Sequence, residues 1–232
     1  MKLDLDFSVL ARGDYPQWIV QGVITMLELT ALAWLLAAVL GTVLALLRMT
    51  DSRLCKMAVA AYVEYHQNVP MLVQIFLWYF GIPSLLPESV QMWANAVGGE
   101  FMFAVIAVGL CMAAYLSEDL RGGLRAIPRA QYEASRALGL SYLNAARLVI
   151  LPQAARIALP TMVNHTVLIF KNTSLAMAIG VAELTYVTRE IESQSFRTIE
   201  VYLLSTVIYL AVSLLIMAGG AALEQRYRIR TR

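Results

Sequence analysis

Two polar clusters interrupt stretches of this sequence that are otherwise apolar, and they contain the side chains best suited to act on a ligand. One cluster lies in the run 57–80 and the other in the run 157–182. Ionisable groups within a bilayer are costly, so they usually face protein or water and indicate a transport path. The hydroxyl side chains could also bind carbonyls in a broken helix. The candidate path residues are Glu64, His66, Lys171, Asn172, Thr173 and Ser174.

The alternative interpretation of these clusters is structural, with Glu64 and Lys171 forming an ion pair. A metal site is not expected, because the only two histidines, His66 and His165, are isolated from other potential ligands. The sequence also has no Gly-Lys pair, and hence no P-loop, and it lacks the G-x-S-x-G, HExxH and CxxC patterns. We therefore expect no enzyme activity, no cofactor and no ATP hydrolysis by this chain.

The composition indicates an integral membrane protein. Of the 232 residues, 59% are hydrophobic and only 15% are charged, whereas soluble domains are about 25% charged. A net charge of only +2 gives no reason to expect nucleic-acid binding. A transmembrane helix needs about 20 mostly apolar residues. The sequence predicts a single all-α domain over 1–232 with five spans, at about 18–47, 57–80, 92–116, 157–182 and 201–223.

The distribution of basic residues predicts the orientation of these spans. Thirteen of the eighteen Lys and Arg residues lie in the segments 48–56, 121–156 and 226–232. Four lie on the other side, namely Lys2, Arg12, Arg189 and Arg197. Because cytoplasmic loops carry the excess of Lys and Arg, we expect the amino terminus outside and the carboxyl terminus in the cytoplasm.

The cytoplasmic link between the third and fourth predicted spans is too polar to cross a membrane and too long for a turn. Pro128 can open a helix, Gly139 suits a helix end and Ser141 suits the next N-cap. Pro152 is expected to close that second helix. The segment of about 121–152 therefore predicts two short helices with a sharp bend at Gly139, a shape suited to docking.

This link resembles the EAA loop of the permease subunits of bacterial ATP-binding cassette importers. The similarity lies in Glu133-Ala134-Ser135, then Gly139 after three intervening residues, then Val149-Ile150-Leu151-Pro152. The family pattern has Ala at Ser135 and Ile at Val149, and both changes are mild. Further segments, including Lys171-Asn172-Thr173-Ser174-Leu175, resemble the polar amino-acid branch of this family.

The resemblance implies a role in coupling for the link. In the family this loop lies in a groove of the ATPase subunit, and the implied coupling residues are Glu133, Ala134, Ser135, Gly139, Leu151 and Pro152. The alternative is a solvated loop in which Glu133 pairs with Arg129 or Arg136 at helical spacing. The resemblance also implies a second permease subunit, two cytoplasmic ATPases and an external solute-binding protein, in a bacterial cytoplasmic (inner) membrane.

Two departures from the branch concern the substrate. His66 stands where members commonly have Arg, and Asn172 stands where many have Asp. Replacement of that Asp removes a negative charge beside Lys171, whereas the loss of the usual Arg at His66 works in the other direction. On balance we expect an acidic or amide amino acid rather than arginine or lysine. The rival class for the whole chain is a passive channel or scaffold subunit that needs no ATPase.

Overall fold

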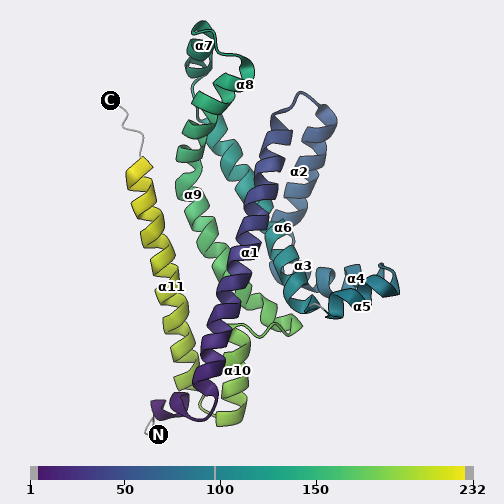
Figure 1. Ribbon diagram of the computed structural model, residues 1–232, viewed down its shortest axis with the longest axis vertical. Coiled ribbons are helices and arrows are strands. Elements are labelled where there is room, and N and C mark those ends of the chain that lie inside the picture. The colour runs from purple at the N-terminus through teal and green to yellow at the C-terminus, as the bar shows by residue number, and fades with distance from the viewer. Residues whose placement is uncertain (1–4, 97, 228–232) are drawn as a thin grey trace.

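The computed structural model describes residues 5–96 and 98–227, and these residues form helices without any β-strand (Figure 1). Of the basic residues used to predict orientation, Lys2, Arg228, Arg230 and Arg232 lie outside this range. The prediction of an all-α membrane protein is confirmed at this level.

Among the described residues, three helices are long and apolar enough to cross a membrane, and the bent pair Tyr142–Ile179 with Leu184–Ser195 would be a fourth span. The three helices are α1 (Tyr15–Met49), α6 (Gly99–Arg125) and α11 (Thr198–Tyr227), and they run along the long axis of the molecule in Figure 1. The predicted spans 18–47 and 201–223 lie within α1 and α11. Large apolar side chains on the outer faces of these two helices, such as Val39 and Leu215, are exposed, as expected for surfaces in contact with lipid.

Small residues bring α1 and α6 together. Ala33, Ala37, Gly41 and Ala45 are spaced every four residues and are all buried. A Cβ atom added to Gly41 would lie only 3.0 Å from the carbonyl oxygen of Ala113 in α6. Small residues at this spacing allow helix backbones to approach closely. Their partner helix is therefore in the same chain, a point that the sequence could not decide.

The predicted span 57–80 is not one helix. Its first part is α2 (Arg53–Asn68), which runs back beside α1, and its second part continues from α3 (Met71–Phe76) in another direction (Figure 1). Between them Val69 is extended, with φ −96° and ψ 130°. Pro70 explains the break, because proline forces the preceding residue out of the α region and has no N–H to donate. After α3 the chain forms η2 (Leu77–Gly81), α4 (Ile82–Ser84) and α5 (Glu88–Ala96).

The predicted third span, 92–116, combines parts of two helices. Met92 lies in α5, and α6 begins only at Gly99, after Gly98 with a φ of +78°. A left-handed residue of this kind separates two helices rather than continuing one. At the other end, α6 continues to Arg125, so its last turns extend beyond the apolar run.

The predicted fourth span, 157–182, is part of a longer helical path. This path passes through α9 (Leu151–Asn172) into a 3-10 segment, η4 (Thr173–Ile179), and ends at Gly180, whose φ is +91°. The next helix, α10 (Leu184–Ser195), leaves at an angle of 50°. Because Gly readily adopts positive φ, it allows this sharp change of direction.

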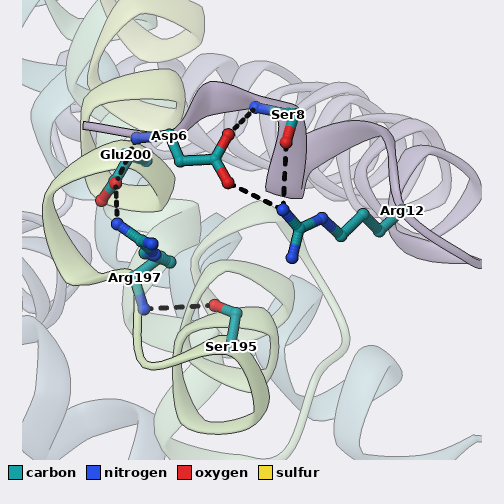
Figure 2. Close-up of polar contacts among 6 residues, drawn as sticks. All are labelled: Asp6, Ser8, Arg12, Ser195, Arg197 and Glu200. Atoms are coloured by element: carbon teal, nitrogen blue, oxygen red, sulfur yellow. Dashed lines mark hydrogen bonds and ion pairs between the residues drawn. The ribbon is translucent and has the colours of Figure 1, made fainter. Parts of the chain in front are cut away.

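A polar clasp ties the start of the chain to the start of α11 (Figure 2). The backbone N–H of Asp6 donates to the Glu200 carboxylate at 2.9 Å, and Arg197 donates to the same oxygen at 3.3 Å. The Asp6 carboxylate in turn accepts from Ser8 and Arg12. The hydrogen bonds from Ser8 lower the pKa of Asp6, so this carboxylate stays charged to a lower pH than an ordinary aspartate does.

Candidate functional site

The predicted helix-bend-helix is present at one end of the molecule (Figure 1). Helix α7 (Arg129–Ala137) starts after its N-cap Pro128, and α8 (Tyr142–Ala145) starts after Ser141, whose side chain accepts from the Asn144 N–H. Gly139 has a φ of +81°. The bend is a Schellman motif, since Leu140 N–H donates to the Ser135 carbonyl and Gly139 N–H donates to that of Arg136.

The prediction that Pro152 closes the second helix is wrong. Pro152 lies in the first turn of α9, and the chain remains helical from α8 through a π-helical turn, η3 (Ala146–Ile150). In this wider turn the Leu151 N–H donates to the Ala146 carbonyl. The π turn replaces i→i−4 hydrogen bonds with i→i−5 bonds just before Pro152, which has no N–H to donate. The helix therefore continues through this proline. From Tyr142, three residues after the bend at Gly139, the chain is therefore continuously helical into α9.

The predicted coupling residues differ in exposure. Glu133, Ala134, Gly139 and Pro152 are exposed and Leu151 is 38% exposed. Ser135 is buried, and its hydroxyl donates to the Gln131 carbonyl at 2.7 Å, so it has a structural role within α7.

Glu133 does not form the ion pair that the solvated-loop alternative requires. Among the described residues it has no salt bridge, and Arg136 instead donates to the Leu140 carbonyl at 2.7 Å. The carboxylate is thus available to a partner molecule.

Large apolar side chains surround the bend although this segment lies beyond the long apolar helices. The exposed members are Leu138 at 83%, Tyr142 at 60%, Leu143 at 77% and Leu148 at 62%. Clusters of exposed apolar residues of this kind mark interaction surfaces. Together with Glu133 they form a surface, which we name the bend surface, suited to a protein groove.

The candidate path residues near Pro70 point in different directions. Glu64 is exposed on α2, and its carboxylate accepts from Asn68 on the same helix at 3.0 Å. His66 is 5% exposed, and its Nδ1 lies 2.6 Å from Gln74 Oε1. In this chain His66 is therefore a packed part of the helix break rather than a group facing an open path.

Gln74 holds the two sides of this break together. Its amide Nε2 donates to the carbonyls of His66 at 3.0 Å and Val69 at 2.7 Å, and its side chain is completely buried. These carbonyls lie at the end of α2, where the helix can no longer provide donors. Sequence analysis missed this residue, although an amide four positions after a proline in an apolar run was a usable signal.

The second cluster also divides between two faces. Lys171 and Ser174 line a hollow of about 570 Å³ between α9 and α11. Thr173 is buried and donates to the Phe170 carbonyl at 2.7 Å, as expected for a hydroxyl at a helix break. The Asn172 amide lies 3.9 Å from the sulfur of Met112 in α6.

The structure therefore does not bring the six candidate path residues into one site. The alternative pair of Glu64 with Lys171 is not formed, because Glu64 binds Asn68. What does come together is the backbone, since α3 contacts η4. Two interruptions of helical structure, from distant parts of the sequence, thus lie against each other inside the chain.

A buried carboxylate beside the hollow was not among the candidates. Glu183 is fully buried and caps α10 by accepting from the N–H groups of Thr185 and Tyr186. The Tyr209 hydroxyl of α11 also donates to it at 2.9 Å. These partners belong to α10 and α11, so Glu183 fixes the position of α10 against α11. An acidic residue directly before a helix was the available signal.

Comparison with known proteins identifies the family. A sequence model described as "Binding-protein-dependent transport system inner membrane component" matches residues 37–229, which is most of the chain. The chain belongs to this family. The resemblance on which the prediction rested is therefore confirmed.

Relatives of known function include several amino-acid permeases. The glutamate/aspartate import permease protein GltJ of Escherichia coli (strain K12) is 31% identical, over 97% of this chain and 93% of its own length. The nopaline transport system permease protein NocM of Agrobacterium fabrum is 34% identical, over 89% and 88%. The arginine transport system permease protein ArgU of Corynebacterium glutamicum is 32% identical, over 87% of this chain and 65% of its own length.

Solved structures agree with this family. One, described as an amino acid ABC transporter with histidines, has a TM-score of 0.83 and 29% identity, with 97% of this chain and 100% of that chain covered. The MetNI methionine transporter shares the fold, with a TM-score of 0.73 at 18% identity over 93% of this chain and 97% of that chain. The comparisons give no support to a passive channel or scaffold.

Proposed function

We propose that this permease forms part of the path for a polar amino acid in an ATP-driven importer. The observation that carries the proposal is the bend surface, an exposed apolar and acidic knob joined to a membrane helix without interruption. Because the chain has no P-loop, the energy comes from separate ATPase subunits. Closure of those subunits on ATP would displace the bend surface, and α9 would transmit the movement to η4. This movement would shift the population between the inward-open and outward-open states.

The assembly that we propose contains a second permease subunit, two cytoplasmic ATPases and an external solute-binding protein. A single chain of this size provides only part of the wall of a transport path, so a symmetric or related partner is needed. We place the assembly in the cytoplasmic (inner) membrane of a bacterium. The family description and the amino-acid permeases among the relatives support this arrangement.

We further propose five membrane crossings with the amino terminus outside. The crossings are α1, the broken path of α2 with α3, α6, the path of α9 with η4, and α11. The excess of basic residues near the α1–α2 and α6–α7 connections supports this orientation. Single cysteines at positions 192 and 125 test it: an impermeant thiol reagent should label position 192 in intact cells, and labelling of position 125 would invert the topology.

The substrate that we propose is an acidic or amide amino acid. The hollow that contains Lys171 has hydroxyl groups from Ser174, Thr185 and Tyr209 but no carboxylate among its lining residues. Such a cationic hollow favours an anionic or neutral polar side chain over a cationic one. In a strain with only this importer, excess glutamate, aspartate or glutamine should abolish uptake. Competition by arginine alone would contradict this proposal about substrate and leave the importer function intact.

Coupling to an ATPase can be tested on the bend surface. We expect the double variant Leu138→Asp/Leu143→Asp to lose co-purification with the ATPase, because two charges would enter an apolar contact. The matched control is Phe196→Asp, since Phe196 is 85% exposed at the end of α10, far from the bend surface. ATPase retention by the control and loss by the double variant supports the proposal. Failure of the wild-type chain to retain any ATPase would favour a passive channel.

A further inference from the structure

A basic hollow lies where α1 and α2 connect and α6 ends. Its volume is about 530 Å³, and its lining residues are Arg48, Met49, Lys56, Arg121, Leu124 and Arg125. It is distinct from the bend surface and from the Lys171 hollow, and no step of the proposed transport cycle uses it. Four cationic side chains from three helices thus converge on one concave surface.

An internal carboxylate neutralises only part of this charge. Glu118 accepts from Arg48 with one oxygen and from Arg121 with the other, the Arg121 Nε contact being 2.8 Å. This bridge orients both guanidinium groups. Within the described residues, neither Lys56 nor Arg125 has a side-chain hydrogen bond or ion pair, and both are exposed. The hollow therefore retains a positive charge that an anion can neutralise.

The surroundings of the hollow are apolar, which distinguishes a lipid from a soluble anion. Met49 and Leu124 line the hollow beside the cations, and Met49 is 43% exposed. A soluble phosphate would gain nothing from this surface. A phospholipid would place its phosphate among the basic groups and its acyl chains along these side chains.

We propose that this hollow binds the headgroup of an anionic phospholipid, such as phosphatidylglycerol, from the surrounding leaflet. Lys56 and Arg125 supply the charge that attracts the phosphate, and Arg48 and Arg121, oriented by Glu118, donate hydrogen bonds to it. Bound lipid would join the α1–α2 connection to the end of α6, close to the helix that leads into α7. The inference does not depend on the substrate, and the proposed orientation places this leaflet on the cytoplasmic side.

The test is a titration of short-chain phosphatidylglycerol against the intact transporter complex in neutral detergent, followed by native mass spectrometry. We expect the wild-type complex to bind this lipid in preference to phosphatidylcholine. The variant Lys56→Gln/Arg125→Gln should bind it roughly thirtyfold more weakly, as expected for the loss of two cations near a lipid phosphate. The matched control Arg156→Gln/Arg226→Gln removes two cations that do not line the hollow, and it should bind like the wild type.

A charge-preserving variant, Lys56→Arg/Arg125→Lys, separates binding from misfolding and should retain most of the affinity. If the Lys56→Gln/Arg125→Gln variant does not assemble, the thermal midpoint of the wild-type complex decides instead. Phosphatidylglycerol should raise that midpoint and phosphatidylcholine should not. Equal affinity for phosphatidylglycerol in the Lys56→Gln/Arg125→Gln variant and the control variant would overturn the proposal. Displacement of the lipid by inorganic phosphate alone would indicate a free-anion site, and loss of the ATPase with unchanged lipid affinity would indicate a protein contact. Either result would also overturn it.

Discussion

Pro70 and Pro152 each interrupt backbone hydrogen bonding in a helical region, but the chain responds in opposite ways. At Pro70 the helix breaks, Val69 becomes extended and α3 takes a new direction. At Pro152 a π turn precedes the proline and the helix continues. A glutamine accompanies each: Gln74 is buried and binds two carbonyls, whereas Gln153 is half-buried and binds one, that of Val149.

The difference shows that a proline alone does not decide whether a helix ends. A break inside the protein is stable only when the freed carbonyls find donors, and Gln74 provides them. At Pro152 the wider turn removes most of the need for a donor. The first arrangement creates an irregular segment at a helix junction, and the second preserves a stiff connection to the bend surface.

The largest expected effect concerns the contact that holds the continuous helix in place. A Cβ atom at Gly123 of α6 would lie 2.4 Å from the backbone oxygen of Ala154, two residues after Pro152. Gly123→Ala should therefore lower the free energy of unfolding by about 3 kcal/mol, because neither backbone can easily move. The neighbouring Gly122→Ala meets no atom within 4 Å and should be neutral or slightly stabilising, because Ala is the better helix former. Thermal unfolding of both purified variants measures the difference, and equal midpoints would contradict this packing.

Replacing each glutamine measures how much its hydrogen bonds stabilise the chain at the two prolines. Gln74→Met conserves volume but leaves the carbonyls of His66 and Val69 without their donor, so we expect a loss of about 2 kcal/mol. Gln153→Met should cost about 0.5 kcal/mol, because its single bond is partly open to solvent. Unfolding midpoints under the same detergent conditions provide the comparison. A smaller effect at Gln74 than at Gln153 would refute the role given to Gln74.

The bend at Gly139 tests whether the stiff connection matters for transport. Gly139→Val should strain the backbone by about 1–2 kcal/mol, since a β-branched residue resists a φ of +81°. An added side chain meets no atom within 4 Å, so the effect is purely conformational. ATP hydrolysis should continue while uptake falls. Gly139→Asn, which tolerates this backbone conformation, should transport normally, and full transport by the Val variant would contradict the coupling role of the bend.

The smallest expected effect is at Pro152 itself. Pro152 is exposed and the helix already accommodates it, so Pro152→Ala should change the free energy of unfolding by no more than about 0.5 kcal/mol. Helical content by circular dichroism should also remain the same. A gain of several helical residues would mean that the proline, and not the π turn, determines the local structure.

The sequence predicted the elements that depend on local chemistry. The caps at Pro128 and Ser141 and the left-handed Gly139 follow from backbone preferences, and α1 and α11 follow from long uncharged runs. The direction in which a helical side chain points was harder to predict. Three ionisable residues lie in otherwise apolar stretches, Glu64 and His66 in one and Lys171 in another. Each side chain faces a different environment, because its surroundings depend on which helices pack against each face.

The continuous helix behind Pro152 has a mechanical consequence. From Tyr142 to Asn172 it is about 45 Å long at 1.5 Å per residue. A hinge at Pro152 would absorb a displacement of the bend surface instead of passing it to the rest of α9. The helical path continues to η4 although Pro160 also lies inside α9, so under the proposed coupling a displacement of the bend surface would reach η4.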